Sequence, residues 1–146
     1  MKCFTMHDEK RLNFIIEDIE IYLEKLNKLK IDPENLKDDE KFLASSMAIF
    51  QIINRSIDLG DEIVKSDKLG YPMKIKDIFE FLENEKILDK DLSNKMKDLV
   101  MVRNRFSHHY EKINEEDIFD FLKEDQKYVL EFIERIKNYL RDKNNN

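Results

Sequence analysis

Residues 42–53 read FLASSMAIFQII and would be apolar on nearly every side of a helix. A helix that is hydrophobic all round is buried within a protein core. We therefore expect a central helix that starts near Asp38 or Asp39 and continues to about Ser66. Gly60 falls inside this helix and marks either a weak point or a close packing contact.

An amphipathic helix is expected before the central one, from about Asp8 to Lys30. Its apolar residues recur at spacings of three and four, which places them on one face. They are Leu12, Ile15, Ile16, Ile19, Leu23 and Leu26. The helix should end by Asp32, because the residue before Pro33 is pushed out of the α region.

Three more helices are expected after the central one. The clearest loop is 69–72 (LGYP), and a short helix should follow at about 75–84. Asp89 and Asn114 are placed as N-caps of the last two helices, and Asp117 completes a variant of the capping box. The inward positions are Ile78, Phe79, Phe81, Leu82, Leu92, Met96, Leu99, Val100, Val102, Ile118, Leu122, Val129, Phe132, Ile133, Ile136 and Leu140.

The composition agrees with a few long helices. The 146 residues include two Gly and two Pro, which is too few for the many turns of a β-sandwich or barrel. We therefore predict an all-α, up-and-down helical bundle of four to five main helices. A single domain is expected over residues 1–146, with an ordered core at about 8–141 and a frayed tail at 142–146.

Charge and cysteine content narrow the classes of function. The chain has 26 Lys and Arg against 32 Asp and Glu, a net charge of −6, so its overall charge does not indicate a nucleic-acid binder, and binding of phosphate would have to rest on a local basic patch. The lone cysteine, Cys3, excludes an internal disulfide and a zinc cluster. Without a signal-like or membrane-spanning apolar segment, we expect a cytoplasmic protein. The lack of a Gly-rich phosphate loop argues against a kinase or an ATPase.

One segment, residues 101–112 (MVRNRFSHHYEK), differs from its surroundings. Residues 95–112 contain five Lys or Arg against two acids, a local charge of +3. Arginine suits phosphate oxygens, and histidine can transfer protons near neutral pH. With no metal ligands nearby, this set favours ribonuclease-like transfer, in which a base deprotonates the 2′-hydroxyl and arginine stabilises the phosphoryl charge.

The spacing of the segment raises a geometric question. Arg103 and His108 would lie some 140° apart around a continuous helix. We therefore expect a helix end or a turn between them, held by Asn, Ser and His side chains, that folds both into one pocket.

The pattern Arg103-Asn104-x-x-x-His108-x-Tyr110 resembles the R-x4-H-x-Y motif of HepT-like toxins in the HEPN superfamily. The resemblance extends from roughly Leu12 to Leu140. It implies a helical homodimer in which two motifs face one cleft, and metal-independent RNA cleavage by a toxin of a type VII-like toxin–antitoxin system.

The resemblance also implies a role for each motif residue. Arg103 and His108 become the catalytic pair, and Asn104 their polar support. Tyr110 becomes the site to which a minimal nucleotidyltransferase antitoxin transfers AMP. We add Arg105, His109 and Lys112 as candidate RNA-binding residues. No cofactor and no metal are expected, and His109 departs from the usual family residue.

Other interpretations stay open. A histidine pair near a helix end is often structural, Arg103 could pair with a carboxylate, and Tyr110 could be a core residue. The chain could also be a catalytically inactive HEPN module that binds a nucleotide or partner and acts with a nucleotidyltransferase. The acidic net charge favours that alternative. A purely structural helical dimer is the third interpretation.

Overall fold

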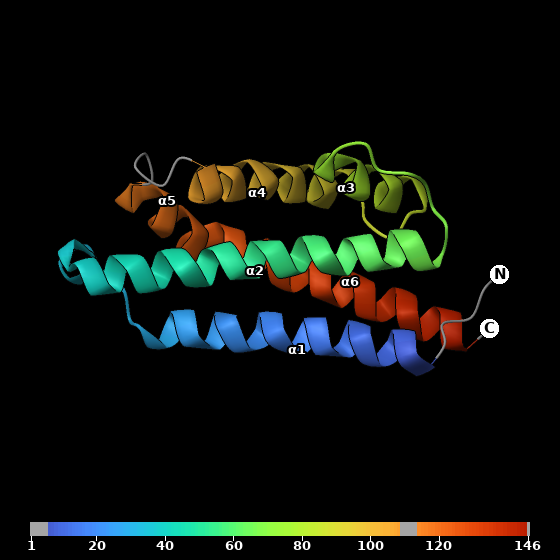
Figure 1. The fold of residues 1–146 in the computed structure, drawn as a ribbon, viewed down its shortest axis with the longest axis horizontal. Coiled ribbons are helices and arrows are strands. Elements are labelled where there is room, and N and C mark those ends of the chain that lie inside the picture. The colour runs from blue at the N-terminus through green and yellow to red at the C-terminus, as the bar shows by residue number, and fades with distance from the viewer. Residues whose placement is uncertain (1–5, 109–113, 146) are drawn as a thin grey trace.

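The structure, a computed structural model, describes the backbone of residues 6–108 and 114–145 and the side chains of residues 8–106 and 114–145. Within these residues it is all-helical and contains no strand, which confirms the predicted fold class (Figure 1). The elements are α1 (Met6–Lys28), η1 (Asn35–Lys37), α2 (Asp39–Ser66), α3 (Ile75–Asn84), α4 (Lys90–His108), α5 (Glu115–Asp120), η3 (Phe121–Asp125) and α6 (Gln126–Asn144).

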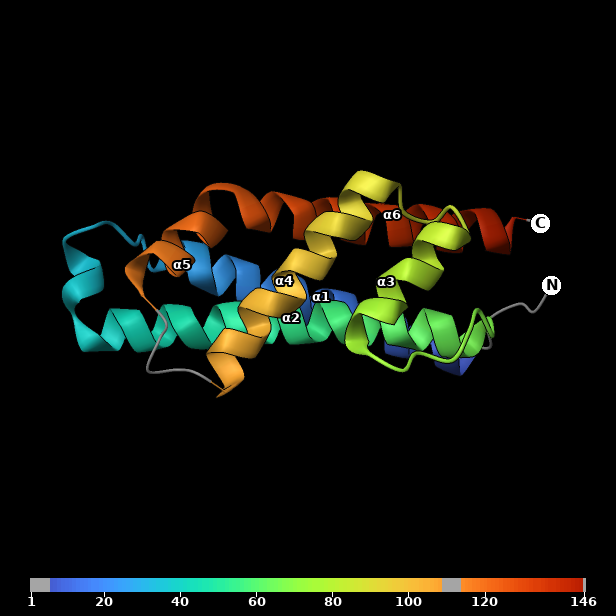
Figure 2. The same ribbon diagram turned by 90° about the horizontal axis from the view of Figure 1, so that it is seen from above.

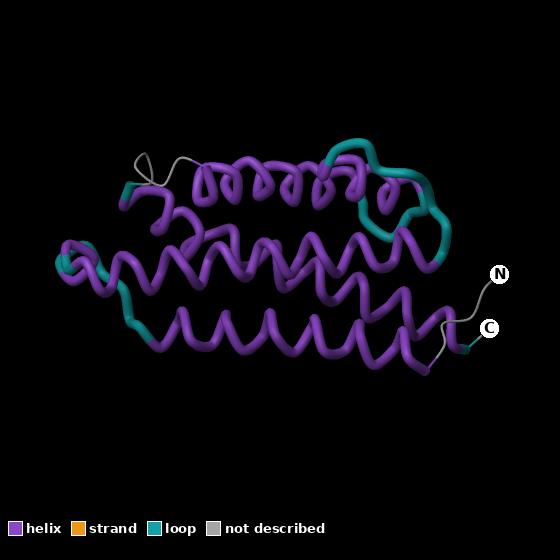
Figure 3. Tube along the Cα trace, in the orientation of Figure 1, coloured by secondary structure: helices purple, strands orange, loops and turns teal. Residues whose placement is uncertain are grey.

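The helices form three layers. α1 lies on one side, α2 and α6 fill the middle, and α3 and α4 cover the other side (Figure 1). Seen from above, α4 crosses obliquely over α2 and α6 (Figure 2). α1 and α2 run in opposite directions and are joined by a loop at one end of the bundle, and the loop that follows α2 lies at the other end (Figure 3). In the described part of the chain, no helix is long and apolar enough to cross a membrane.

The caps predicted at Asp89 and Asn114 are confirmed, and Asp38, where a helix start was expected, proves to be the cap of α2. Asp38 caps α2, with its Oδ1 accepting from the Glu40 amide at 3.1 Å. The Leu92 amide donates to Asp89 Oδ1 at 2.8 Å at the start of α4. Asn114 and Asp117 form the reciprocal capping box that begins α5. Polar residues placed just before apolar periodic segments thus set the helix starts.

The core agrees with the predicted apolar periodicity. All six apolar positions assigned to the first helix are buried, and most of those in the later helices are buried with them in one cluster. Four of the expected inward residues are only partly buried against that cluster: Phe81, Val102, Leu122 and Leu140. Gly60 proves to be a close packing contact, because a Cβ there would lie 2.9 Å from Ile78 Cγ2.

The prediction that residues 42–53 are buried all round is wrong. Leu43 and Met47 are 63% and 71% exposed, whereas Ile49, Ile52 and Ile53 are fully buried. α2 packs against α1 on one side and against α3, α4 and α5 on others. No helix of the described residues covers the face that carries Leu43 and Met47, so this apolar strip stays on the surface.

The end of α6 also differs from the prediction. Residues 142–144, expected in a frayed tail, are helical. Lys143 is buried and forms an ion pair with Asp67, at the end of α2, and the Tyr139 hydroxyl donates to the same carboxylate. Burial and this hydrogen bond raise the pKa of Tyr139. These contacts hold the last turn of α6 against α2.

The final helix contains a wider π turn, η3, between α5 and α6. Ile118, Phe121, Val129 and Phe132 are buried there at helical spacings, and Asp125 falls in the same inward stripe. Burial raises the pKa of Asp125 to about 6, helped by the nearby carboxylates of Asp120, Glu124 and Asp98 and opposed by Lys95. The fold therefore favours the neutral form of this acid.

This raised pKa predicts a pH-dependent stability. Because the pKa of Asp125 is about 6 in the fold against 3.8 in the unfolded chain, its contribution is fully present below about pH 4 and is lost as the pH rises through about 6. Asp125→Asn should match the parent at pH 4 and exceed it at pH 7.5 by about 1–2 kcal/mol, allowing for partial exposure. Urea unfolding at both pH values measures this difference.

The control is Asp142→Asn, which removes an exposed carboxylate from α6. A constant difference between Asp125→Asn and the parent from pH 4 to pH 7.5 would contradict the prediction.

Candidate functional site

Arg103, Asn104 and the backbone of His108 lie at the C-terminal end of α4, and the predicted turn between Arg103 and His108 is wrong. The backbone of α4 stays helical through His108. Apolar positions recur along α4 as far as Phe106, which is buried. Its burial keeps the last turn against the core and extends the helix. The positions of Arg103 and His108 therefore differ by about 140° around one helix axis.

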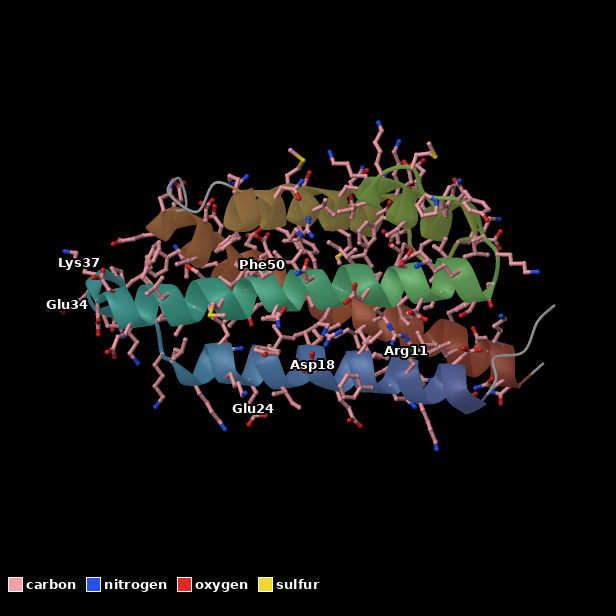
Figure 4. All side chains as sticks on the ribbon, in the orientation of Figure 1. Arg11, Asp18, Glu24, Glu34, Lys37 and Phe50 are labelled. Carbon is pink, nitrogen blue, oxygen red and sulfur yellow. The ribbon has the colours of Figure 1, made fainter. Side chains whose placement is uncertain are left out.

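Arg103 is held by two amide oxygens and an aromatic ring. Its Nε donates to Asn54 Oδ1 at 2.8 Å, and its Nη1 donates to Asn104 Oδ1 at 3.0 Å. Its Cζ lies 6.0 Å from the centroid of the Phe50 ring. Phe50 and Asn54 are one turn apart on α2, and Phe50 lies on the side of α2 nearer α4 and α5 (Figure 4). The half-buried guanidinium is thus fixed at the junction of α2 and α4.

This environment separates Arg103 from most other arginines of the chain. Among the described residues, no carboxylate forms an ion pair with Arg103, although acids outnumber bases. Arg141 also pairs with an amide, that of Asn138, but on the exposed face of α6. The other four arginines pair with carboxylates: Arg11 with Glu62, Arg55 with Asp18 and Asp58, Arg105 with Asp117, and Arg135 with Asp89 and Glu131.

Arg105 has a structural partner. Its Nη2 donates to Asp117 Oδ1 at 2.9 Å, and the other oxygen of Asp117 accepts from the Asn114 amide. The pair joins α4 to the start of α5, on either side of residues 109–113. The charge of Arg105 is therefore matched within the chain, and its predicted contact with RNA stays a prediction.

The local charge of the segment is also partly compensated by other helices. Lys97 forms an ion pair with Glu80 on α3. Lys95 lies 5.2 Å from the centroid of the Tyr128 ring and interacts with Asp125. Among the Lys and Arg side chains of this segment that the structure describes, Arg103 is the one whose contacts are all to uncharged groups.

The remaining predicted residues are placed less fully. The backbone of His108 belongs to α4, but its side chain lies outside the described part. His109, Tyr110 and Lys112 also lie outside the described residues. Their predicted roles stay predictions. In the rest of the chain, no group of three or more His, Cys, Asp or Glu side chains is arranged to hold a metal ion.

Sequence reasoning missed Asn54 and Phe50. A signal was present, because Asn54 is an amide one turn after Phe50 and directly follows the apolar stretch 42–53. A polar residue at the edge of such a run needs a hydrogen-bond partner, and Arg103 supplies it. The pairing itself joins residues 49 apart in sequence and could not be read from either helix alone.

Several solved structures share this fold. A tri-AMPylated HEPN toxin of Shewanella oneidensis in complex with an MNT antitoxin is 21% identical, with a TM-score of 0.80 over 87% of this chain and 96% of that one. A toxin–antitoxin structure with AMP-PNP is 20% identical, with a TM-score of 0.81 over 87% and 97%. YutE, a cytosolic protein of unknown function from Bacillus subtilis, is 18% identical, with a TM-score of 0.77 over 89% and 90%.

The sequence comparison goes beyond the fold. No curated protein sequence matches the chain. Residues 15–136, well over half of the chain, match the family described as Ribonuclease HepT-like. This range runs from the middle of α1 to the middle of α6 and includes Arg103 with its α2 partners. The chain belongs to the HepT-like ribonuclease family.

Proposed function

We propose that this protein is a metal-independent endoribonuclease toxin of a type VII-like toxin–antitoxin system. Family membership supports ribonuclease activity. The observation that carries the proposal is the partly buried Arg103, whose described partners are all uncharged. An arginine in this state suits a phosphate, the anion that an RNA backbone would supply.

The proposed reaction is transfer of the phosphoryl group within the RNA chain. His108 acts as general base or acid; as base it takes the proton of a 2′-hydroxyl. The 2′-oxygen attacks the adjacent phosphorus, the bond to the 5′-oxygen breaks, and a 2′,3′-cyclic phosphate forms. The leaving 5′-oxygen takes a proton from water or a second imidazole. Arg103 stabilises the charge on the phosphoryl oxygens, and Asn104 supports its guanidinium.

A homodimer is part of the proposal, because positions 103 and 108 face different directions around a single copy of α4. Leu43, Met47, Phe50 and Asn54 share one face of α2 at helical spacings, so the exposed apolar strip leads directly to Arg103. A second copy placed on this strip would bury it and bring a second motif to the same cleft. Met101 on α4 adds further exposed apolar surface.

The proposed partner is a minimal nucleotidyltransferase antitoxin that transfers AMP to Tyr110. Support comes from the structural relative described as a tri-AMPylated HEPN toxin in complex with an MNT antitoxin. An AMP group would add bulk and negative charge beside the phosphate site and so exclude RNA. Arg105, His109 and Lys112 stay candidate RNA contacts, and we place the protein in the cytoplasm.

A catalytically inactive binding module is the second candidate. The net charge of −6 favours it, as do the carboxylate partners that Lys97 and Arg105 have within the chain. Such a module would bind the nucleotidyltransferase and a nucleotide and would cleave no RNA.

Cleavage assays separate these candidates. The purified parent should cleave single-stranded RNA in the presence of EDTA. Arg103→Ala and His108→Ala should each lose about 100-fold or more of that activity, because they remove charge stabilisation and proton transfer. Arg141→Ala, which removes an exposed arginine far from the motif, is the control and should cleave like the parent. Equal cleavage by the parent and both motif variants would rule out the proposed active site.

Intact mass tests the proposed modification. After co-expression with the antitoxin, the protein should carry one or more added AMP groups, and Tyr110→Phe should abolish or reduce this addition because the acceptor hydroxyl is gone. Tyr71→Phe is the control, since Tyr71 is a highly exposed tyrosine in the loop between α2 and α3. Full AMP addition to Tyr110→Phe would show that the acceptor is elsewhere.

Gel filtration with light scattering tests the proposed dimer. Met47→Glu should shift the protein from dimer to monomer at micromolar concentration, because it places a charge in the apolar strip. Phe14→Glu alters another exposed apolar residue, on α1 and 60% accessible, and should leave the dimer intact. A parent protein that is already monomeric would contradict the shared cleft.

A further inference from the structure

Asn54 holds Arg103 from a different helix. Its Oδ1 accepts from Arg103 Nε at 2.8 Å, and this bond joins α2 to α4. The Nε–H vector fixes the plane of the guanidinium, since Nε lies at the junction of the flexible side chain and the planar group. Asn104 Oδ1 accepts from Nη1 on the same guanidinium, and the Phe50 ring lies 6.0 Å away. The group is therefore oriented by neighbours on both helices.

The acceptor is an uncharged amide, and this choice has an electrostatic consequence. Four arginines of the chain donate to carboxylates, which cancel much of their charge. At position 54 a carboxylate would have nearly the same shape and would accept the same hydrogen bond. The amide instead leaves the full positive charge of Arg103 in place, in a partly desolvated position where charge interactions are stronger than in water.

We infer that Asn54 is a positioning residue that orients Arg103 toward the RNA phosphate while leaving its charge uncompensated. The inference rests on the proposed function, since it concerns the RNA phosphate that Arg103 binds in that proposal. Asn54 acts through Arg103 and is not itself a catalytic residue. A carboxylate at position 54 would both orient the guanidinium and neutralise its charge. The amide of Asn54 orients the guanidinium without neutralising it.

The test exchanges the amide for its isosteric acid. Asn54→Asp keeps the hydrogen bond and adds a charge, whereas Asn54→Ala removes the hydrogen bond and adds no charge. Asn138→Asp is the matched control, because Asn138 accepts from Arg141, the other arginine with an amide partner, on the exposed face of α6. The measurements on the full chain are the melting temperature, RNA cleavage in EDTA, and binding of a 2′-O-methyl RNA oligonucleotide, which lacks the attacking hydroxyl.

Opposite effects on stability and binding are expected for Asn54→Asp. Its melting temperature should equal or exceed that of the parent, because an ion pair to Arg103 forms. Its affinity for the 2′-O-methyl oligonucleotide should fall about tenfold. The dependence of that affinity on salt concentration should also weaken, by the amount that corresponds to about one lost phosphate contact per site. Asn54→Ala should bind nearly as well as the parent but show a kcat reduced about tenfold, because Arg103 is less well oriented. Asn138→Asp should match the parent throughout.

The outcomes separate this inference from the proposed function. If Asn54→Asp binds and cleaves like the parent, the inference is overturned and the ribonuclease proposal stands. If activity in both variants simply follows the melting temperature, Asn54 is a structural residue and the inference is again overturned. If the parent cleaves no RNA but binds the oligonucleotide, and Asn54→Asp weakens that binding, the inference holds and the ribonuclease proposal fails. A parent that binds no oligonucleotide overturns the inference.

Discussion

α2 packs against α1, α3, α4 and α5, and the rest of the structure depends on how its faces are shared among these neighbours. The buried faces carry Ile49, Ile52 and Ile53 and account for the position of the helix in the middle layer. The face that no described helix covers carries Leu43 and Met47 and continues to Phe50 and Asn54. The same helix therefore supplies the centre of the core, an exposed apolar strip and the groups that hold Arg103.

The groups that α2 places around Arg103 explain how a chain with a net negative charge would bind an anionic substrate. Most basic residues described near the motif have acidic neighbours, so the excess of acids over bases is spread over the surface. Arg103 differs because its contacts in the described part of the chain are to two amides and a ring rather than to carboxylates. A charge retained at one partly buried point can attract a phosphate even when the net charge is −6.

Local sequence signals were sufficient for the helices. The caps at Asp38, Asp89 and Asn114 and the apolar spacing in α1 placed helix starts and buried faces where the structure has them. Features that depend on neighbouring helices were not predictable in this way. The exposure of Met47 depends on which helices cover α2, and the π turn at η3 has no counterpart in a simple helical period.

The candidate site also has one part that local sequence predicts and one part that depends on how the helices pack. The motif on α4 was visible as a local pattern, but the turn expected after Arg103 is absent because the burial of Phe106 extends the helix. The Asn54–Arg103 hydrogen bond required knowledge of how α2 and α4 pack.

The central claim is that Arg103 stabilises a phosphate attacked by the neighbouring 2′-oxygen. Mass spectrometry of the ends of the RNA fragments tests it most directly. The account predicts a 2′,3′-cyclic phosphate on one fragment and a 5′-hydroxyl on the other, from the parent but not from Arg103→Ala. Fragments ending in a 3′-hydroxyl and a 5′-phosphate would contradict it, because they require attack by water rather than by the 2′-oxygen.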